Sequence, residues 1–215
     1  MRNYKKVLLD PEDCVLLLID HQAQMYFGIE AKTRGTVMNA AEGLARTASV
    51  FKVPVVMTTV TANTFAGPMY EEILNVFPGH SPIDRSTLNA WEDIRVKKAV
   101  VSTGRKKLIL AGLWTEICVT FPALSALSDG YDVYVVADAC AGSSREAHDM
   151  AMQRLIQAGV VPVTWQALLL EFQRDWANKE TYTPVTALIE ECGGAYGMGL
   201  KYVQQMMPAR ANAAN

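Results

Sequence analysis

Short apolar runs alternate along this chain with longer stretches whose apolar residues recur at helical spacing. The runs lack polar alternation, which predicts strands buried on both faces of a sheet. They lie at residues 13–20, 53–59, 108–111, 132–138 and 160–165, and 83–85 reads as a brief extended segment. Between them the spacing predicts helices, for example from Thr36 to Phe51. This alternation predicts an α/β fold, with a doubly wound, mostly parallel sheet and helices on both faces.

The stretch from Lys107 to Ala123 holds the most reactive candidate residue. A buried strand ends at Gly112, a tight turn follows, and Cys118 stands at the start of the next predicted helix. Free N–H groups and the helix dipole favour negative charge there, so the thiol pKa is expected to fall below its free value of about 8.5. The same N–H groups can receive an oxyanion. The alternative is a small buried hydrophobe, the usual role of a free cysteine.

Two further candidates follow other strands. Asp20 closes the first strand, and Arg85 ends the extended segment. Because the carboxyl ends of parallel strands meet at one edge of a sheet, Asp20, Arg85 and Cys118 are expected to lie together. The cation can stabilise a thiolate, the carboxylate can move a proton, and the turn amides can receive an oxyanion. For Asp20 the alternative is a helix cap or a turn former.

Composition narrows the function classes. The 215 residues predict one domain spanning residues 1–215, and a net charge of −2 gives no reason to expect nucleic acid or a membrane as a partner. No apolar run reaches the roughly 18 residues that span a bilayer, and the first residues lack a signal-peptide pattern, so a cytoplasmic protein is expected. The tail at 179–215 is not needed to close the sheet and is expected at a subunit interface.

Cysteine and glycine patterns argue against bound groups. The four cysteines form no CxxC pair, and with only three histidines no zinc spacing appears. Neither GxGxxG nor GxxxxGK[ST] follows a strand, so no nucleotide cofactor is expected. The expectation is an enzyme without a metal or a cofactor.

Several segments resemble a known family. LLLIDHQ around Asp20, LILAGLWTEICV around Cys118 and the strand that ends in VVADA resemble the isochorismatase-like cysteine hydrolases. NAW at 89–91, TEICVTFPALSAL at 115–127 and EFQRDW at 171–176 are similar to the YcaC-like branch. The resemblance covers residues 10–178 in matching order.

The resemblance implies a six-stranded parallel sheet and a triad of Asp, a basic residue and Cys. Asp20 and Cys118 match directly, and Arg85 stands where the family usually has lysine. Arg85 can hold a carboxylate and a thiolate by charge and fork geometry, but it cannot give up a proton as a lysine can. The resemblance also implies a cis peptide at Trp114–Thr115 and an oxyanion hole from the N–H groups of Ile117 and Cys118. The Asp-x-His metal motif of nicotinamidases has no equivalent in this chain.

Together these features predict a hydrolase that cleaves a small amide or another C–N bond through a Cys118 thioester. Gln22, Phe27, Asn89 and Trp91 are candidates for binding the small-molecule substrate, although core packing is the alternative for the aromatic residues. The resemblance implies a homo-oligomer, an octamer. The alternative function is a redox-reactive thiol protein or an oligomeric binding scaffold that retains the hydrolase fold.

Overall fold

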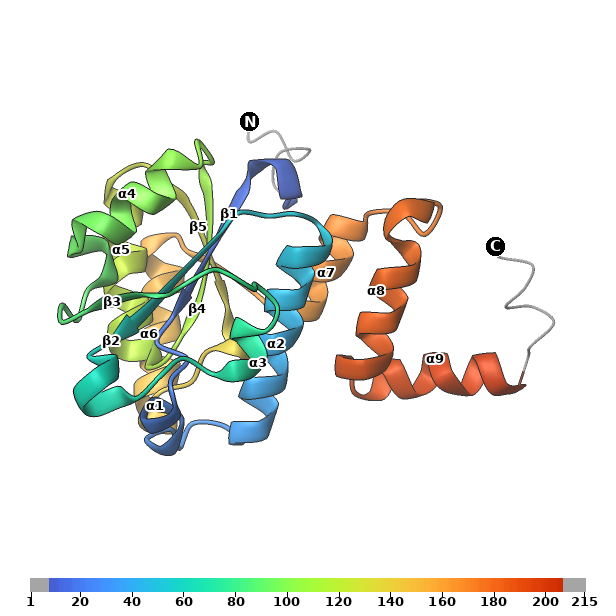
Figure 1. Ribbon diagram of the computed structural model, residues 1–215, viewed down its shortest axis with the longest axis horizontal. Helices are drawn as coiled ribbons and strands as arrows, with labels where there is room; N and C mark the ends of the chain where they lie inside the picture. The colour runs from blue at the N-terminus through green and yellow to red at the C-terminus, as the bar shows by residue number, and fades with distance from the viewer. Residues whose placement is uncertain (1–7, 207–215) are drawn as a thin grey trace.

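A computed structural model describes residues 8–206 and contains one six-stranded sheet in that range (Figure 1). All of its strand pairs are parallel, and the strand order is β3-β2-β1-β4-β5-β6. The strands are β1 (Cys14–Ile19), β2 (Val55–Val60), β3 (Ile83–Arg85), β4 (Lys107–Gly112), β5 (Asp132–Val136) and β6 (Val161–Val163). The predicted doubly wound sheet is confirmed.

Strand β1 is the centre of the sheet. Leu16 pairs with Val55 of β2 on one side and with Ile109 of β4 on the other. Every residue of β1 and of β4 is buried, which explains why both read as unbroken apolar runs. The chain order reverses at β1, because β2 and β3 lie to one side and β4 to β6 to the other, and such a switch point is where open α/β sheets bind their ligands.

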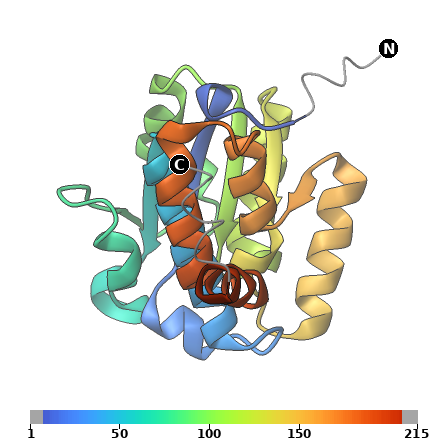
Figure 2. The same ribbon diagram turned by 90° about the vertical axis from the view of Figure 1, so that its right-hand side faces the viewer.

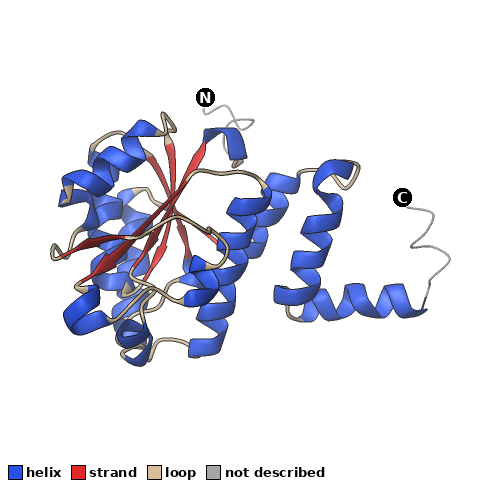
Figure 3. Ribbon diagram, in the orientation of Figure 1, coloured by secondary structure: helices blue, strands red, loops and turns tan. Residues whose placement is uncertain are grey.

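Helices cover both faces of the sheet (Figure 3). Helices α4, α5 and α6 form one layer, and α2 and α7 form the other, with α8 packed outside α2 and α7 (Figure 1). The helices are α1 (Ala23–Phe27), α2 (Arg34–Val50), α3 (Glu71–Leu74), α4 (Ile94–Ser102), α5 (Thr120–Ser128), α6 (Arg145–Ala158), α7 (Trp165–Gln173), α8 (Lys179–Cys192) and α9 (Ala195–Met206). Within residues 8–206, none of them is long and apolar enough to cross a membrane.

Short helical turns shape the loops at both ends of the strands. They are η2 (Pro11–Asp13), η3 (Ala62–Ala66), η4 (Ala90–Glu92), η5 (Thr115–Val119) and η6 (Ala137–Ala139). The turn η5 is a π-helical turn that follows β4 and leads directly into α5. Pro122 lies in the first turn of α5, where its missing N–H costs no hydrogen bond.

The C-terminal extension contains two helices, α8 and α9. The break between them is limited to Gly193 and Gly194, and α9 begins at Ala195. Gly197, inside α9, allows a close approach, since a Cβ there would lie 2.3 Å from the carbonyl oxygen of Ile189 on α8. Figure 2 views the molecule from the side of this C-terminal arm, which we define as α8 and α9. The last nine residues of the predicted 179–215 extension lie outside the described range.

Candidate active site

Asp20 lies directly after β1, at the carboxyl edge of the sheet. Its φ is 55°, in the left-handed region that aspartate tolerates better than most side chains. The backbone N–H of Asp20 donates to the carbonyl oxygen of Thr58 at 2.9 Å, which holds this turn against β2. The side chain is completely buried. A buried carboxylate in such a conformation needs a partner of opposite charge.

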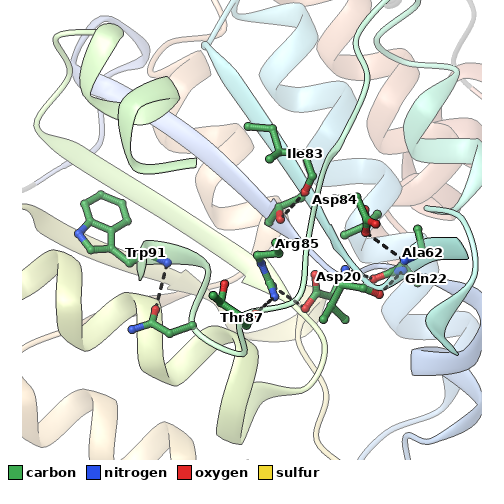
Figure 4. Close-up of polar contacts among 12 residues, drawn as sticks. Asp20, Gln22, Ala62, Ile83, Asp84, Arg85, Thr87 and Trp91 are labelled. Carbon is green, nitrogen blue, oxygen red and sulfur yellow. Dashed lines mark hydrogen bonds and ion pairs between the residues drawn. The ribbon is translucent and has the colours of Figure 1, made fainter. Parts of the chain in front are cut away.

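Arg85 supplies that charge from two strands away. It is the last residue of β3, and its side chain crosses the end of β2 so that Nη2 donates to Oδ2 of Asp20 at 2.7 Å (Figure 4). Nη1 donates to the carbonyl oxygen of Thr87. Both side chains of this ion pair are fully buried. Nε of Arg85 and Oδ1 of Asp20 have no hydrogen-bond partner among residues 8–206, so each retains bonding capacity at the site.

Cys118 approaches the pair from the other side of β1. It lies on η5, after β4, and only 3% of its surface is exposed. Its thiol is close enough to Asp20 for Coulomb and hydrogen-bond interactions to change the pKa of both groups, and Arg85 acts on the thiol as well. The structure thus brings together the three groups that the sequence placed at one edge: an acid, a cation and a thiol.

The protonation states differ from the expectation for a helix N-terminus. Burial, together with the neighbouring Asp20, raises the pKa of the Cys118 thiol to about 12, against smaller lowering effects of Arg85 and the Trp114 backbone. The predicted low thiol pKa is therefore wrong, because desolvation outweighs the cation and the helix end. Burial also raises the pKa of Asp20, to about 6, although Arg85 opposes the shift. Near pH 7 the site holds a neutral thiol beside an ionised carboxylate.

The turn that carries Cys118 also corrects two expectations. The cis peptide bond joins Leu113 to Trp114, one residue earlier than the expected Trp114–Thr115 bond. The resemblance located the turn but not the bond within it. The N–H of Ile117 already donates to the carbonyl oxygen of Trp114 at 3.1 Å. Ile117 is therefore not an available oxyanion donor, and the N–H of Cys118 is the remaining candidate.

A set of polar contacts fixes η5 to the segment before and within α6. The N–H of Thr115 donates to the carbonyl oxygen of Ala141 at 3.0 Å, and Oγ1 of Thr115 is hydrogen-bonded to Nδ1 of His148 at 2.8 Å. Oε1 of Glu116 accepts from the N–H and the hydroxyl of Ser143. Ser143 therefore does not cap α6; Ser144 does, by accepting from the N–H of Ala147. These contacts position the turn that bears Cys118.

His148 in this set is neutral at ordinary pH. Burial and the nearby Lys32 lower its pKa to about 4. Its contact with Thr115 is that of a structural residue. The sequence offered no signal for the pairing, because Thr115 and His148 belong to different elements.

The four residues proposed to bind substrate have other contacts. Gln22 is fully buried, donates to the carbonyl oxygens of Val60 and Gly67, and accepts from the N–H of Val60 (Figure 4). Its amide thus joins the loop after β1 to the end of β2 and leaves no polar atom for a substrate. Phe27 is 72% exposed at the end of α1. Neither residue offers a free polar group to the Cys118 site.

Asn89 and Trp91 have structural contacts as well. Oδ1 of Asn89 accepts from the N–H of Trp91 at 3.0 Å and caps η4, while its Nδ2 donates to Glu92 and Ser125. The Trp91 ring packs edge-on against Tyr131 at 5.2 Å, and its Nε1 donates to Asp129 at 2.7 Å. The alternative of core packing therefore describes Trp91 better than substrate binding.

Two residues beside Asp20, Arg85 and Cys118 were not predicted from the sequence. The carbonyl oxygen of Thr87 orients the Arg85 guanidinium, and the buried Oγ1 of Thr87 has no partner among the described residues. His21 follows Asp20, is completely buried, and donates from Nε2 to the carbonyl oxygen of Ala139 at 3.1 Å. Burial lowers the pKa of His21 to about 4, so it is neutral. The Thr87 contact is made by its backbone carbonyl, which every residue type has, so the sequence could not indicate it.

Comparison with known proteins identifies the fold and the family. The model of the isochorismatase domain matches residues 14–167. The probable hydrolase YcaC of Escherichia coli is 39% identical over 173 residues, which cover 80% of this chain and 83% of that protein. The secreted isochorismatase effector Isc1 of Phytophthora sojae is 26% identical and covers 85% of this chain and 87% of its own length.

Solved structures agree with these matches. The YcaC gene product from Escherichia coli, described as an octameric hydrolase of unknown specificity, superposes with a TM-score of 0.89 at 34% identity, over 94% of this chain and 98% of its own. YcaC from Pseudomonas aeruginosa, solved with hexane-2,5-diol and covalent acrylamide, gives a TM-score of 0.86 at 34% identity, over 91% and 96% of the two chains.

Proposed function

The chain belongs to the isochorismatase family, in its YcaC-like branch, and is a hydrolase; from this premise we propose that Cys118 is the nucleophile that cleaves a small amide or another C–N bond. The observation that carries the proposal is the buried ion pair of Asp20 and Arg85 beside the Cys118 thiol. Two charged side chains with no exposed surface are costly to the fold, and such groups concentrate at active sites.

The raised pKa values of Cys118 and Asp20 suggest which group gives up a proton and which accepts it. A thiol with a pKa of about 12 is a weak nucleophile by itself, and an ionised carboxylate with a pKa of about 6 can accept its proton as the sulfur attacks. Sγ of Cys118 forms a bond to the carbonyl carbon, and the carbonyl oxygen becomes an oxyanion that the N–H of Cys118 receives. Arg85 holds Asp20 in place and balances its charge.

The intermediate then collapses in two stages. Asp20 returns its proton to the nitrogen, the C–N bond breaks, and the amine leaves a thioester on Cys118. A water molecule attacks the thioester carbonyl while Asp20 accepts a proton from it, and the carboxylic acid product leaves as the sulfur regains a proton. Asp20 is ionised again at the end of each turnover, so Arg85 never needs to lose a proton. An arginine in the place of the family lysine is therefore compatible with this mechanism.

A relative supports a nucleophile of this kind. The Pseudomonas aeruginosa YcaC structure contains covalently attached acrylamide. Acrylamide is a small primary amide whose double bond reacts with thiols. We propose that Cys118 is the residue of this chain that reacts in the same way. The alternative role as a redox-sensing thiol is less favoured, because oxidation proceeds through the thiolate and this thiol is protonated.

The substrate is proposed as a small molecule, and the assembly as a homo-oligomer. The Escherichia coli relative is an octamer, and the two chains superpose over almost their whole lengths. An octamer is accordingly the assembly expected for this chain.

Acrylamide labelling tests the nucleophile without knowledge of the substrate. Intact-mass analysis is expected to show one adduct, which peptide mapping places on Cys118. The matched control is Cys192→Ser, because Cys192 is also a free, buried cysteine but lies on α8. The control should label as the wild type does, and Cys118→Ser should not. A panel of small amides then tests turnover by ammonia release. Equal release by wild type and Cys118→Ser would contradict the proposal.

A further inference from the structure

Buried polar atoms without a hydrogen-bond partner are concentrated at the candidate active site. Seven such side-chain atoms lie among residues 8–206, and three of them belong to Asp20, Arg85 and Thr87. A buried donor or acceptor without a partner costs free energy, so native proteins pair nearly all of them. Under the proposed function, Oδ1 of Asp20 can accept the proton of Cys118. Nε of Arg85 and Oγ1 of Thr87 have no part in that mechanism.

These two atoms belong to one rigid group of contacts beside Asp20. In an arginine, the Nε hydrogen and Nη2 share one edge of the planar guanidinium, and Nη2 of Arg85 donates to Oδ2 of Asp20 at 2.7 Å. Nε therefore faces the Asp20 side of the guanidinium. The carbonyl oxygen of Thr87 accepts from Nη1, which fixes Thr87 beside the same group (Figure 4). A cationic donor and a hydroxyl are thus held next to the carboxylate.

The order of the strands separates these two atoms from Cys118. Arg85 ends β3 and reaches Asp20 from one side of β1, whereas Cys118 follows β4 on the other side. The N–H of Cys118, which we propose receives the oxyanion, therefore lies across the carboxylate from Nε of Arg85 and Oγ1 of Thr87. A group bound by these two atoms is consequently a part of the substrate other than the bond that is cleaved.

The charges at the site favour an uncharged group there. Asp20 and Arg85 balance each other, and neither side chain is exposed. Asp20 affects the pKa of the Cys118 thiol more than Arg85 does, so the field at the thiol is negative. A substrate carboxylate would meet this field and a cation that is already paired. A neutral carbonyl oxygen has two lone pairs and can accept from both Nε and the Thr87 hydroxyl without that cost.

We propose that Nε of Arg85 and Oγ1 of Thr87 form a polar subsite for an uncharged carbonyl-containing group of the substrate, such as a carboxamide, separate from the scissile bond. The inference rests on the proposed function, because the subsite orients a substrate toward Cys118. The Thr87 hydroxyl contacts the substrate and takes no part in the proton transfers. Thr87 is thus a residue that determines specificity, since it selects small amides that carry this second polar group.

Two vinyl reagents of similar size test the subsite. Acrylamide and acrylonitrile both add their terminal carbon to a thiol, but only acrylamide carries a carbonyl oxygen beyond that carbon. Thr87→Val is expected to slow acrylamide labelling of Cys118 about three- to tenfold, as for the loss of one hydrogen bond, and to leave acrylonitrile labelling nearly unchanged. Thr87→Ser should keep the wild-type ratio of the two rates. Ser86→Ala, at the exposed neighbouring residue, is the matched control and should keep it as well.

Reagents that differ in charge test the class of group. Iodoacetamide and iodoacetate differ in an amide and a carboxylate, and each labelling rate is divided by the rate of the same reagent with free cysteine. Iodoacetate is expected to label wild-type Cys118 about tenfold more slowly on this scale, because its charge faces Asp20. A faster relative rate for iodoacetate would overturn the assignment of an uncharged group.

Stability separates substrate binding from a structural role of the hydroxyl. Valine replaces the unpartnered Oγ1 of Thr87 with a methyl group, so the midpoint of urea unfolding should stay at or above that of the wild type. A lower midpoint with equal slowing by both vinyl reagents would overturn the proposal, as would unchanged acrylamide labelling in Thr87→Val. Wild-type protein that none of the reagents labels at Cys118 would contradict the proposed nucleophile, and the subsite with it. The other failures concern the subsite alone.

Discussion

Two arginine–carboxylate pairs of equal length lie in very different surroundings. Arg85 meets Asp20 at 2.7 Å in the candidate active site, and Arg46 of α2 meets Glu191 of α8 at 2.7 Å where the C-terminal arm joins the domain. The side chains of the first pair are completely buried, whereas those of the second are 29% and 56% exposed. Distance alone therefore does not distinguish them.

Burial determines what each pair contributes. Water solvates the exposed pair in the folded and unfolded chain alike, so its formation changes the free energy of unfolding by about 0–1 kcal/mol. The buried pair has lost its hydration, and apolar residues of similar volume would often stabilise a fold more. Arg46 and Glu191 orient the arm. The burial of Asp20 and Arg85 is not explained by a gain in fold stability. This is the physical reason for proposing that the pair has a catalytic role.

The largest effect is expected at Asp20, which we propose accepts the proton of Cys118. Asp20→Asn should slow acrylamide labelling of Cys118 by about 10²–10⁴-fold, the usual contribution of a general base. With a raised pKa of about 6, Asp20 loses its proton as the pH rises through that value. The wild-type rate should therefore climb about tenfold per pH unit below 6 and level off above 7.

The same pH profile can contradict that assignment. A thiol that reacts without Asp20 and has a pKa of about 12 would show a rate that rises through pH 7, 8 and 9 without levelling. Asp20→Asn should show this unbroken rise if it retains any labelling. Cys192→Ser is again the control for the profile. A wild-type rate with no change of slope near pH 6 would remove Asp20 from the mechanism.

The next prediction compares how much each ion pair contributes to the free energy of unfolding. Arg85→Met should lower the free energy of unfolding by about 3–5 kcal/mol, because it leaves the Asp20 carboxylate buried and unpaired. Arg46→Met should lower it by no more than about 1 kcal/mol. Urea unfolding of the two variants side by side measures the difference. Equal losses would show that burial does not distinguish these pairs.

A smaller effect is expected at the turn that carries Cys118. Thr115→Val removes the hydrogen bond to Nδ1 of His148 and leaves that buried nitrogen unpaired, at a cost of about 1–3 kcal/mol. Thr64→Val is the matched control, because the Thr64 hydroxyl is exposed and makes only a 3.4 Å contact with the carbonyl oxygen of Thr61. It should change stability by less than about 0.5 kcal/mol.

Thermal unfolding measures both threonine variants, and acrylamide labelling gives a second readout. If the contact positions the nucleophile, Thr115→Val should also slow the labelling of Cys118, whereas Thr64→Val should not. Slower labelling in both variants would point to a general effect on the fold. An unchanged free energy of unfolding in Thr115→Val would mean that the contact with His148 contributes nothing measurable.

The sequence predicts the location of the candidate site, at one edge of the sheet, better than it predicts the protonation states of the side chains there. Asp20 and the turn before Cys118 each follow an apolar run, and Arg85 ends a brief extended segment. Parallel strands bring their carboxyl ends together whatever lies between them. The pKa of Cys118 depends on the balance between desolvation and a nearby cation. That balance is a property of the assembled interior, and residue order does not contain it.

Two other residues also depend on the assembled structure. Gln22 was a candidate for substrate binding, but its amide is hydrogen-bonded to the backbone of β2 and of the loop beyond it. Gly197 lies within a helix although glycine is a poor helix former, because it is a point where α9 touches α8. In both cases the residue contacts another element of the structure, and the local sequence pattern does not show that contact.

The central place of β1 also affects how the protein is made. This strand ends at Ile19, yet its neighbour β4 begins only at Lys107, so during synthesis one side of an entirely apolar strand stays without its partner until half the chain has emerged. Open strand edges in incomplete chains favour aggregation. We expect the nascent chain to depend on molecular chaperones up to that point, and far less once β4 has paired with β1.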